Sequence, residues 1–368
     1  MLAPDSRPTA PSIALVHDYL LVLRGAERTF AAMADLWPDA PVFTLLYDPE
    51  MTMGRFDGHQ IRPSPLQVLG VRQARFRMLL PLFPGAARHL PLDGYDTVVS
   101  SSSAFAHGVV TSPGTRHVCY CHSPFRYAWH EQRRALDEVP TWLRPALRWA
   151  LRRHRRFDLM AAGRVTKFIA NSQITGERIR RYWNRDSEIV HPPVDVDRFR
   201  LAARTEDFLL LVGELVGHKR PELALEAARR AGRRIKVVGT GPELARLRDR
   251  FAGHAEFVGR IDDAELADLY ARADALVVPN VEEFGITAVE AQAAGRPVIA
   301  IDGGGARETV LPGETGWLVP AEDVDALSAA MRRDPAELRE PTAIREHALG
   351  FSREAFQKRI AAAVAETG

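Results

Sequence analysis

The sequence lacks the features that mark secreted and membrane-spanning proteins. It has two cysteines in 368 residues, Cys119 and Cys121. A disulfide between residues two apart would be strained, so we expect free thiols in a reducing compartment. Apolar runs stay well below the roughly 18 residues of a transmembrane helix, and the first twelve residues lack the apolar centre of a signal peptide. We therefore expect a cytoplasmic protein.

An excess of charge of one sign is also missing. The 49 Lys and Arg residues nearly balance the 47 Asp and Glu residues, which leaves a formal net charge of +2. Any basic surface must therefore be local. No nucleic-acid-binding motif accompanies the basic stretches, so we expect no nucleic-acid partner. The length and the 46% share of hydrophobic residues suit a globular protein with two domains, each with its own core.

The glycine pattern of dinucleotide-binding proteins, G-x-G-x-x-G, follows none of the expected strands. This disfavours a nicotinamide-dependent oxidoreductase. The first expected strand, residues 12–16, is followed instead by Arg24-Gly25 and a helix that reaches about Trp37. A single glycine still lets the backbone approach a ligand closely, so Gly25 is a candidate phosphate-facing residue. A plain tight turn is the alternative.

The most informative stretch is residues 275–301, which has the pattern of a buried strand, a loop, a helix and a second buried strand. Its first residues are apolar without alternation, as in a parallel strand covered on both faces. Helical spacing follows over 286–294, and Gly295 suits the position beyond a helix C-terminus. Glu282 falls in the loop after the first strand, and Glu290 falls about one turn inside the helix.

Two kinds of group would meet at the carboxyl end of that strand, where α/β sheets bind ligands. The amides at the start of the helix would attract phosphate and can donate to sugar hydroxyls. These amides belong to Phe284, Gly285, Ile286 and Thr287. Carboxylates repel phosphate, so we assign them hydroxyl partners, a hexose for Glu282 and a ribose for Glu290. The alternative is that the glutamates at 282–283 only cap the helix and favour its dipole.

A family resemblance extends this interpretation. The segment E-E-F-G-I-T-A-V-E-A-Q-A-A-G-R-P-V-I-A resembles the E-x7-E signature of glycosyltransferase family 4, and the similarity continues through 304–320. It implies an α/β protein with the GT-B fold, in which two doubly wound Rossmann-like domains face a central cleft. We expect an acceptor-side domain at 1–190, completed by a C-terminal helix at 351–368. A hinge at 191–200 and a nucleotide-sugar-binding domain at 201–350 make up the rest.

His122 is the strongest candidate residue in the first domain. It stands at the carboxyl end of an expected strand and before Ser-Pro. The segment H-V-C-Y-C-H-S-P-F-R-Y-A-W resembles bacterial mannosyltransferases of O-antigen and exopolysaccharide assembly, a group within the same family. That resemblance implies that His122 lies near the transferred sugar and that Arg126 and Tyr127 lie on the acceptor side. A histidine bonded within a loop is the alternative, and His17 and His107 are weaker candidates.

Two positions depart from the pattern of the relatives. His130 stands where the mannosyltransferase group has Asp, and Glu214 stands where relatives have an Arg that grips the donor pyrophosphate together with a Lys. That Lys is retained as Lys219. A carboxylate about 4 Å from a phosphate charge costs roughly 4 kcal/mol at an effective dielectric constant of about 20. We therefore expect Glu214 to point away or to bind a hydroxyl, with Arg220 as the replacement cation.

The resemblance also bears on the nucleotide base and on metals. It implies that Arg260 and Ile261, just after an expected strand, border the base; an ordinary surface arginine is the alternative. Asp195 and Asp197 spell a D-x-D, which holds a divalent metal in another glycosyltransferase fold. Here the two aspartates lie in the hinge and suit local turns. We expect no metal and no cofactor besides the nucleotide-sugar donor.

Residues 142–157 have the pattern of a strongly amphipathic helix. An apolar arc that includes Trp142 and Phe157 opposes an arginine-rich arc between Arg144 and Arg156. The plain interpretation is a domain helix with a solvated cationic face. The functional interpretation is attraction to anionic lipid headgroups or to an acceptor pyrophosphate, at about 1 kcal/mol for each basic residue near the surface. Lipid attraction would bring the protein to the inner face of the plasma membrane.

Taken together, these features predict a retaining glycosyltransferase. The preferred reaction is transfer of mannose from GDP-mannose to a lipid-linked saccharide or glycan acceptor in cell-surface polysaccharide synthesis. His122, Lys219 and Glu282 are the predicted catalytic residues. Another UDP- or GDP-linked hexose, such as glucose or galactose, is the alternative within the class. From another class, the alternative is a nucleotide-sugar-binding module weakened catalytically by Glu214.

Overall fold

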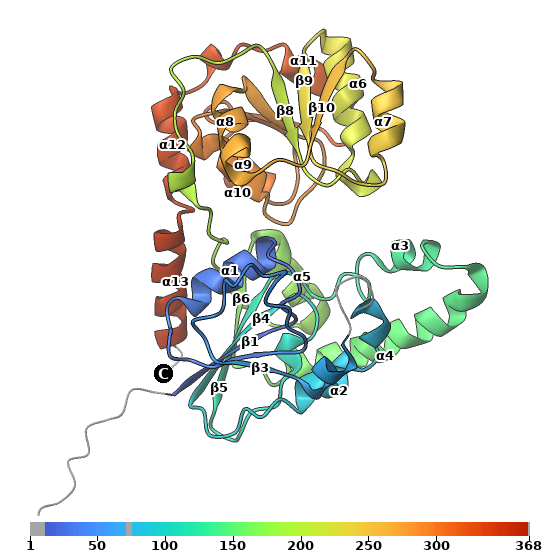
Figure 1. Ribbon diagram of the computed structural model, residues 1–368, viewed down its shortest axis with the longest axis vertical. Coiled ribbons are helices and arrows are strands. Elements are labelled where there is room, and N and C mark those ends of the chain that lie inside the picture. Colours follow the sequence, from blue (N-terminus) through green and yellow to red (C-terminus); the bar gives the residue numbers. More distant parts are fainter. Residues whose placement is uncertain (1–11, 71–75, 367–368) are drawn as a thin grey trace, which may run out of the picture. The chain divides into compact units, whose positions relative to one another are not determined.

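The structure is a computed structural model that describes residues 12–70 and 76–366. The chain folds into two compact units, and each unit is built around one parallel β-sheet with helices packed against it (Figure 1). The first unit contains the described residues up to 171, residues 175–190 and residues 357–366, and the second contains residues 172–174 and 191–356.

The sheet of the first unit has seven strands in the order β3-β2-β1-β4-β5-β6-β7, and all neighbours pair in parallel. Its strands β1 and β4 are buried almost throughout, as expected for strands in the middle of such a sheet. The strands are β1 (Ile13–His17), β2 (Val42–Thr44), β3 (Ile61–Pro63), β4 (Thr97–Ser102), β5 (Arg116–Cys121), β6 (Lys167–Ala170) and β7 (Ser187–Ile189).

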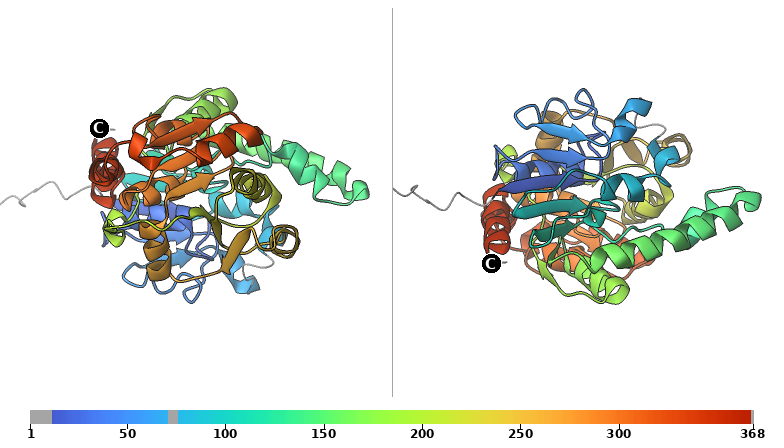
Figure 2. Two further views of the ribbon diagram at one scale, coloured as in Figure 1. Left: turned by 90° about the horizontal axis from the view of Figure 1, so that it is seen from above. Right: turned by 90° about the horizontal axis from the view of Figure 1, so that it is seen from below.

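The helices of the first unit include one pair that extends away from the sheet. Figure 2 shows α3 and α4 leaving the body of this unit as an arm, and the same arm is visible in Figure 1. The inner end of α4 is buried at Leu151, Phe157 and Ala161. The helices are α1 (Gly25–Ala34), α2 (Phe83–Arg88), α3 (Gln132–Asp137), α4 (Arg144–Ala162) and α5 (Gln173–Trp183).

The sheet of the second unit has six parallel strands in the order β10-β9-β8-β11-β12-β13. If β8 is counted as strand 1 of this sheet, the order is 3-2-1-4-5-6. Strands β1 to β6 of the other sheet have the same order. This is the strand order of Rossmann-like folds, and it confirms the expected pair of doubly wound domains. The strands are β8 (Leu209–Val212), β9 (Ile235–Val238), β10 (Ala255–Gly259), β11 (Ala275–Val278), β12 (Val298–Ile301) and β13 (Gly316–Val319).

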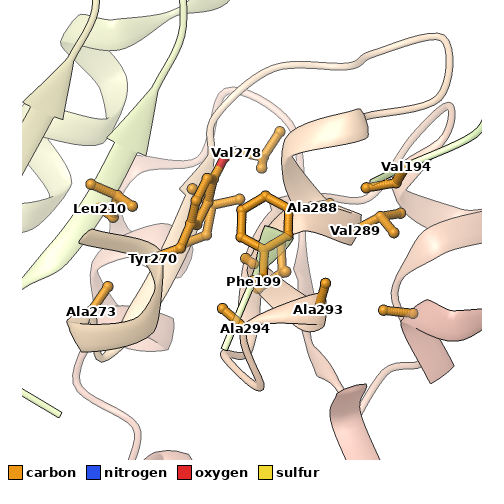
Figure 3. Close-up of a cluster of buried hydrophobic side chains, with 14 of the residues drawn as sticks. Val194, Phe199, Leu210, Tyr270, Ala273, Val278, Ala288, Val289, Ala293 and Ala294 are labelled. Atoms are coloured by element: carbon orange, nitrogen blue, oxygen red, sulfur yellow. The ribbon is translucent and has the colours of Figure 1, made fainter. Parts of the chain in front are cut away.

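The core of the second unit lies between its sheet and the helices that cover it. Figure 3 shows one part of that core, where Phe199 and Tyr270 pack with Val289 and the small residues of α9. The helices are α6 (Pro221–Ala231), α7 (Leu244–Arg250), α8 (Asp263–Arg272), α9 (Ile286–Ala293), α10 (Ala306–Thr309), α11 (Val324–Met331), α12 (Pro341–Leu349) and α13 (Arg353–Ala365), of which α13 belongs to the first unit from residue 357 onward.

The segment β11–α9–β12 has the predicted form. All four residues of β11 and of β12 are buried, and α9 ends at Ala293. Gly295 follows with a φ of +72°, and a side chain there would overlap Leu201. Glycine is therefore required for the chain to turn from α9 into β12.

Candidate active site

Lys219 and Glu282 meet at the carboxyl edge of the second sheet. Lys219 ends the 3-10 turn Gly217–Lys219 that follows β8, and Glu282 lies in the loop between β11 and α9. The ammonium Nζ lies 2.7 Å from the carboxylate Oε1, and the Asn280 amide donates to the same oxygen at 3.1 Å. Both side chains are half-buried. A cation and a carboxylate are thus held at the place where α/β sheets bind ligands.

The loop that carries Glu282 is held from behind by glycines. Gly305 N–H donates to the Glu282 carbonyl at 2.9 Å. A side chain at Gly304 would overlap that carbonyl, and one at Gly305 would overlap the backbone of Phe284. The glycine run therefore lets two backbones touch, and this main-chain contact helps to fix the position of Glu282.

The helix α9 begins beside this loop. Gly285 is its N-cap residue with a φ of +86°, and the first turn carries no acidic residue. Within the described residues, Glu282 bonds to Lys219 and Asn280 rather than to the first amides of α9. The first amides of a helix have no partner inside it. Ile286 and Thr287 are half-buried and Phe284 is buried, so these amides lie at the rim of the core.

Glu290 lies one turn into α9, and both of its carboxylate oxygens are engaged. Arg198 Nη2 lies 3.1 Å from Oε1, and the Tyr270 hydroxyl donates to Oε2 at 2.9 Å. Arg198 also pairs with Asp263 at 2.9 Å. Burial and the Glu290 carboxylate raise the pKa of Tyr270, so its hydroxyl stays a donor. The predicted ribose-binding carboxylate is thus oriented by one cation and one phenol.

The other predicted nucleotide residues of the second unit lie outside this cluster. Arg260 is exposed directly after β10, and Ile261 is half-buried against the core of the unit. Arg220 has a φ of +52° at the N-cap of α6 and pairs with Glu322, not with Glu282. The role of Arg220 as a second cation beside Lys219 stays a prediction.

Glu214, the departure from the family pattern, is exposed. Its backbone is held between Gly213 N–H, which donates to Val238, and Leu215 N–H, which donates to Thr240. No ion pair of Glu214 occurs among the described side chains. That its carboxylate points away from the donor, or binds a hydroxyl, stays a prediction.

In the first unit, His122 directly follows β5 and is half-buried as a residue. The Ser101 hydroxyl lies 2.9 Å from His122 Nε2 and 3.1 Å from His17 Nδ1. Burial lowers the pKa of His122 to about 4. Burial, with His122 nearby, lowers the pKa of His17 to about 3. Two neutral imidazoles therefore share one hydroxyl at the carboxyl ends of β1, β4 and β5.

The remaining predicted residues of the first unit, Gly25, Arg126 and Tyr127, each have other neighbours. Gly25 is the first residue of α1, and the same first turn holds buried Glu27, which accepts from the Arg24 amide at 3.0 Å. Arg126 pairs with Glu131 at 3.9 Å. Tyr127 is half-buried, with its ring 5.6 Å from that of Phe125. Among the described residues, no hydrogen bond, ion pair or ring contact joins Gly25, Arg126 or Tyr127 to His122.

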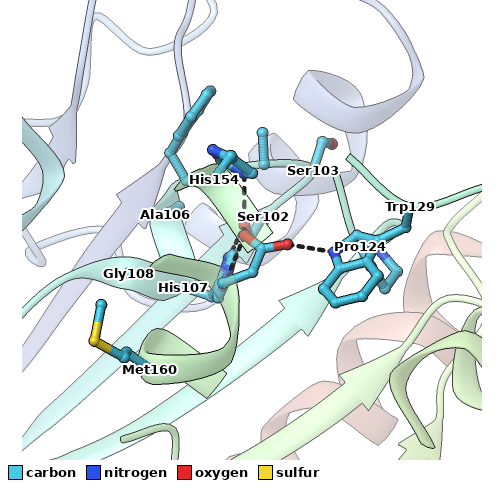
Figure 4. Close-up of polar contacts among 12 residues, drawn as sticks. Ser102, Ser103, Ala106, His107, Gly108, Pro124, Trp129, His154 and Met160 are labelled. Carbon is cyan, nitrogen blue, oxygen red and sulfur yellow. Dashed lines mark hydrogen bonds and ion pairs between the residues drawn. The ribbon is translucent and has the colours of Figure 1, made fainter. Parts of the chain in front are cut away.

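A second buried cluster lies at the root of the α4 arm, and no pattern in the sequence pointed to it. Asp158 is fully buried, and Trp129 Nε1–H donates to its Oδ2 at 2.7 Å (Figure 4). Its Oδ1 lies 3.1 Å from His154 Nε2 and 3.5 Å from His107 Nε2. Burial alone would raise the pKa of Asp158, but His107 and His154 outweigh it and lower that pKa to about 2. We call Asp158 with Trp129, His154 and His107 the Asp158 anchor, because it ties α4 to the rest of the first unit. His107 thus belongs to this anchor.

The faces of α4 differ from the expected pattern. Trp142 was predicted on the apolar arc of this helix, but it lies in the turn before α4 and is 76% exposed. Arg155 was predicted on the solvated arc, but it donates to Gln132 and stacks over Trp129. The outer face carries exposed arginines between apolar side chains. It comprises Arg148, Trp149, Arg152, Arg153, Arg156, Leu159 and Met160.

Over residues 12–70 and 76–366, no group of three or more His, Cys, Asp or Glu side chains could hold a metal ion. In the same ranges no helix has the length and apolar character needed to span a bilayer.

Two family models match the chain. The model described as Glycosyltransferase Family 4 matches residues 23–198, and the model described as Glycosyl transferases group 1 matches residues 194–337. D-inositol 3-phosphate glycosyltransferase of Mycolicibacterium smegmatis is 33% identical over 217 residues, which is 50% of this chain and 49% of the relative. A protein with that name and the number 2, from Catenulispora acidiphila, is 36% identical over 191 residues, 43% of this chain and 45% of the relative. The chain thus spans about half the length of the curated relatives it matches.

Solved structures resemble the whole chain. HepE of Anabaena in complex with UDP has a TM-score of 0.70 at 17% identity, covering 96% of this chain and 100% of that one. Sucrose-phosphate synthase of Thermosynechococcus elongatus has a TM-score of 0.71 at 21% identity, covering 97% and 99%. At these identities the similarity establishes a shared fold.

Proposed function

The chain belongs to glycosyltransferase family 4, and on that premise we propose that it transfers a hexose from a nucleotide sugar to an acceptor with retention of the anomeric configuration. The observation that carries the proposal is the contact of Lys219 with Glu282 beside the start of α9. A cation and helix amides suit a diphosphate, and a carboxylate suits sugar hydroxyls. These three kinds of group are the ones that a nucleotide sugar requires.

In the proposed reaction the bond between the anomeric carbon and the leaving phosphate oxygen breaks. The acceptor oxygen forms its bond on the same face, and its proton passes to the leaving phosphate, so no protein nucleophile is needed. Lys219 and the first amides of α9 stabilise the charge that develops on the diphosphate. Glu282 orients the sugar, and Glu290 holds the ribose. We assign His122 a hydrogen bond to the transferred sugar, as the resemblance implies.

The proposed donor is GDP-mannose. Support comes from the segment around His122, which resembles mannosyltransferases of O-antigen and exopolysaccharide assembly. UDP-glucose is the second candidate, because the similar HepE structures contain UDP and UDP-glucose. Both donors present the same diphosphate to Lys219.

The proposed acceptor is a lipid-linked saccharide or glycan in cell-surface polysaccharide synthesis. An inositol phosphate is the second candidate, because the curated relatives are named for transfer to D-inositol 3-phosphate. The two acceptors differ in their partition into vesicles, so one assay can contain both.

The outer face of α4 supports a location at the inner face of the plasma membrane. Trp149 is 66% exposed and lies among Arg148, Arg152 and Arg156. Arginines attract anionic headgroups, and tryptophan side chains favour the lipid–water interface. The face therefore fits an anionic lipid surface. Vesicles of anionic lipid should bind the wild type but not the double variant Arg152→Glu/Trp149→Ser. Vesicles of zwitterionic lipid should bind neither protein.

The proposed activity is tested with a panel of nucleotide sugars, each combined with a lipid-linked saccharide and with an inositol phosphate. NMR of the product determines its anomeric configuration. We expect turnover with GDP-mannose and the lipid-linked acceptor, and a product with the donor's configuration. Binding of a nucleotide sugar without turnover on any acceptor would favour the weakened binding module, and an inverted product would refute the mechanism.

A further inference from the structure

Three consecutive serines of β4 each lie within hydrogen-bond distance of a different histidine. Successive side chains of a strand point to opposite faces, so Ser101 faces away from Ser100 and Ser102. The distances are 2.8 Å from Ser100 Oγ to His117 Nε2, 2.9 Å from Ser101 Oγ to His122 Nε2, and 3.0 Å from Ser102 Oγ to His107 Nδ1. Of the three, only Ser101 reaches the histidine that follows β5 at the ligand-binding edge of the sheet.

Ser101 also differs because it bridges two imidazoles. Its oxygen lies 3.1 Å from His17 Nδ1 as well as 2.9 Å from His122 Nε2. A hydroxyl has one hydrogen to donate and two lone pairs to accept with. If that hydrogen goes to one histidine, the other must donate to the oxygen. The tautomers of His17 and His122 are therefore linked through Ser101.

His17 and His122 differ in burial and in their access to a ligand. His17 is buried, and its ring stacks on Phe30 with centroids 4.7 Å apart. His122 is only half-buried as a residue. Its Nδ1 has no hydrogen-bond partner in the described part of the chain and is not among the buried unpartnered atoms. Nδ1 is thus the nitrogen through which His122 can address a substrate.

We propose that Ser101 is a positioning residue for His122: it accepts a hydrogen bond from His17 Nδ1–H and donates its own hydrogen to His122 Nε2. His122 then carries its ring hydrogen on Nδ1 and presents a hydrogen-bond donor to the substrate. The substrate part rests on the proposed glycosyl transfer, since phosphate and sugar oxygens are acceptors.

Electrostatics support a neutral His122 ring, which the proposed tautomer requires. Burial keeps the pKa of His122 at about 4, so the ring is not protonated on both nitrogens near neutral pH. A donor at Nδ1 must then come from the tautomer, and the Nδ1–H form exists only if Nε2 accepts. The serine hydroxyl supplies the hydrogen bond that this form requires.

The test is ¹⁵N NMR of histidine-labelled protein, because nitrogen shifts distinguish the two neutral tautomers. Signals of His122 are assigned by their loss in His122→Gln. We expect the Nδ1–H form in the wild type and in Ser101→Thr, which keeps the hydroxyl. Ser101→Ala should shift His122 toward the Nε2–H form. Ser100→Ala is the matched control, since it removes an equivalent bond to His117 and should leave the His122 signals in place.

Turnover provides the second measurement. Ser101→Ala should lower kcat by about 10-fold, the size expected for one lost hydrogen bond, with Ser101→Thr and Ser100→Ala within about 3-fold of the wild type. An Nε2–H tautomer in the wild type, or an unchanged tautomer in Ser101→Ala, overturns the proposal whether or not a nucleotide sugar is turned over. Absence of turnover in the wild type instead counts against the proposed function.

Discussion

Lys219 and Glu282 are 63 positions apart in the chain, yet their ammonium and carboxylate groups lie 2.7 Å from each other. The pairing joins the loop after β8 to the loop after β11, which are neighbouring strands of the second sheet. Each group therefore fixes the other's orientation before any ligand arrives. A substrate diphosphate would meet a lysine that is already positioned.

This contact predicts that the two residues act as a unit. Lys219→Met and Glu282→Gln should each lower kcat by about 100-fold, and the double variant should lose little more, because residues that act together are not additive. Steady-state kinetics with the donor that is turned over measures this. Lys236→Met is the matched control, since Lys236 pairs with Glu256 at 3.2 Å on the same unit and takes no part in the site. Additive losses would show that the contact is incidental.

The exposure of Glu214 predicts a small role in donor binding. Exposed charges are screened by solvent and salt, so Glu214→Gln should change the Kd of a nucleotide sugar by less than about 3-fold. Isothermal calorimetry at two salt concentrations measures the change. Tightening by about 10-fold or more would place the carboxylate beside the phosphates.

The bridge from Arg198 to Glu290 and Asp263 predicts an effect on nucleotide affinity. Without the guanidinium, Glu290 loses one of its two orienting partners, and Arg198→Ala should weaken the Kd for GDP or UDP by about 10-fold. Calorimetry with both nucleotides is the measurement, and Arg200→Ala, at an exposed neighbouring position, is the control. Tighter binding in Arg198→Ala would mean that arginine and ribose compete for the carboxylate.

The buried histidines predict a loss of stability in mild acid. Burial lowers the pKa of His17 and His117 to about 3 and that of His122 to about 4. Between the unfolded value of about 6.5 and these values, the unfolded chain binds more protons than the folded one. The free energy of unfolding should therefore fall as pH falls from about 6.5 toward 4.

Urea denaturation across that range measures the slope. His117→Gln should make the slope shallower, because one of the three neutral imidazoles is gone. His254→Gln removes an exposed histidine and should leave it unchanged. An unaltered slope in His117→Gln would argue that His117 becomes protonated in the folded protein.

Asp158 predicts a further loss of stability at lower pH and a large destabilisation when it is replaced. Its pKa of about 2 in the folded protein lies below the ordinary value, so its contribution is complete above about pH 4 and is lost as pH falls toward 2. Asp158→Asn should lower the free energy of unfolding at pH 7 by about 3 kcal/mol, because a buried charged network is broken. Asp137→Asn on the same arm, where the carboxylate is largely exposed, should cost less than about 0.5 kcal/mol. A small effect of Asp158→Asn would show that His107 and His154 need no anion.

The sequence predicted the architecture because buried parallel strands and helical spacing are local patterns. It missed β3 and β7, which are three residues long, lie at the sheet edges and are only partly buried. It named Lys219 and Glu282 separately, but their contact depends on the order of strands. The Ser101 bridge and the Asp158 anchor join residues from different elements, and periodicity carries no information about such pairs. Trp142 was misplaced because an apolar arc shows which residues are apolar, not which neighbour covers them.

The glycines at 304 and 305 have a consequence for how this protein can change. Because a side chain at either glycine would overlap the backbone of Glu282 or Phe284, neither position can be enlarged without displacing the loop that carries the carboxylate. A lineage that evolves toward another sugar must therefore change other residues around the loop. Positions 304 and 305 themselves accept only glycine.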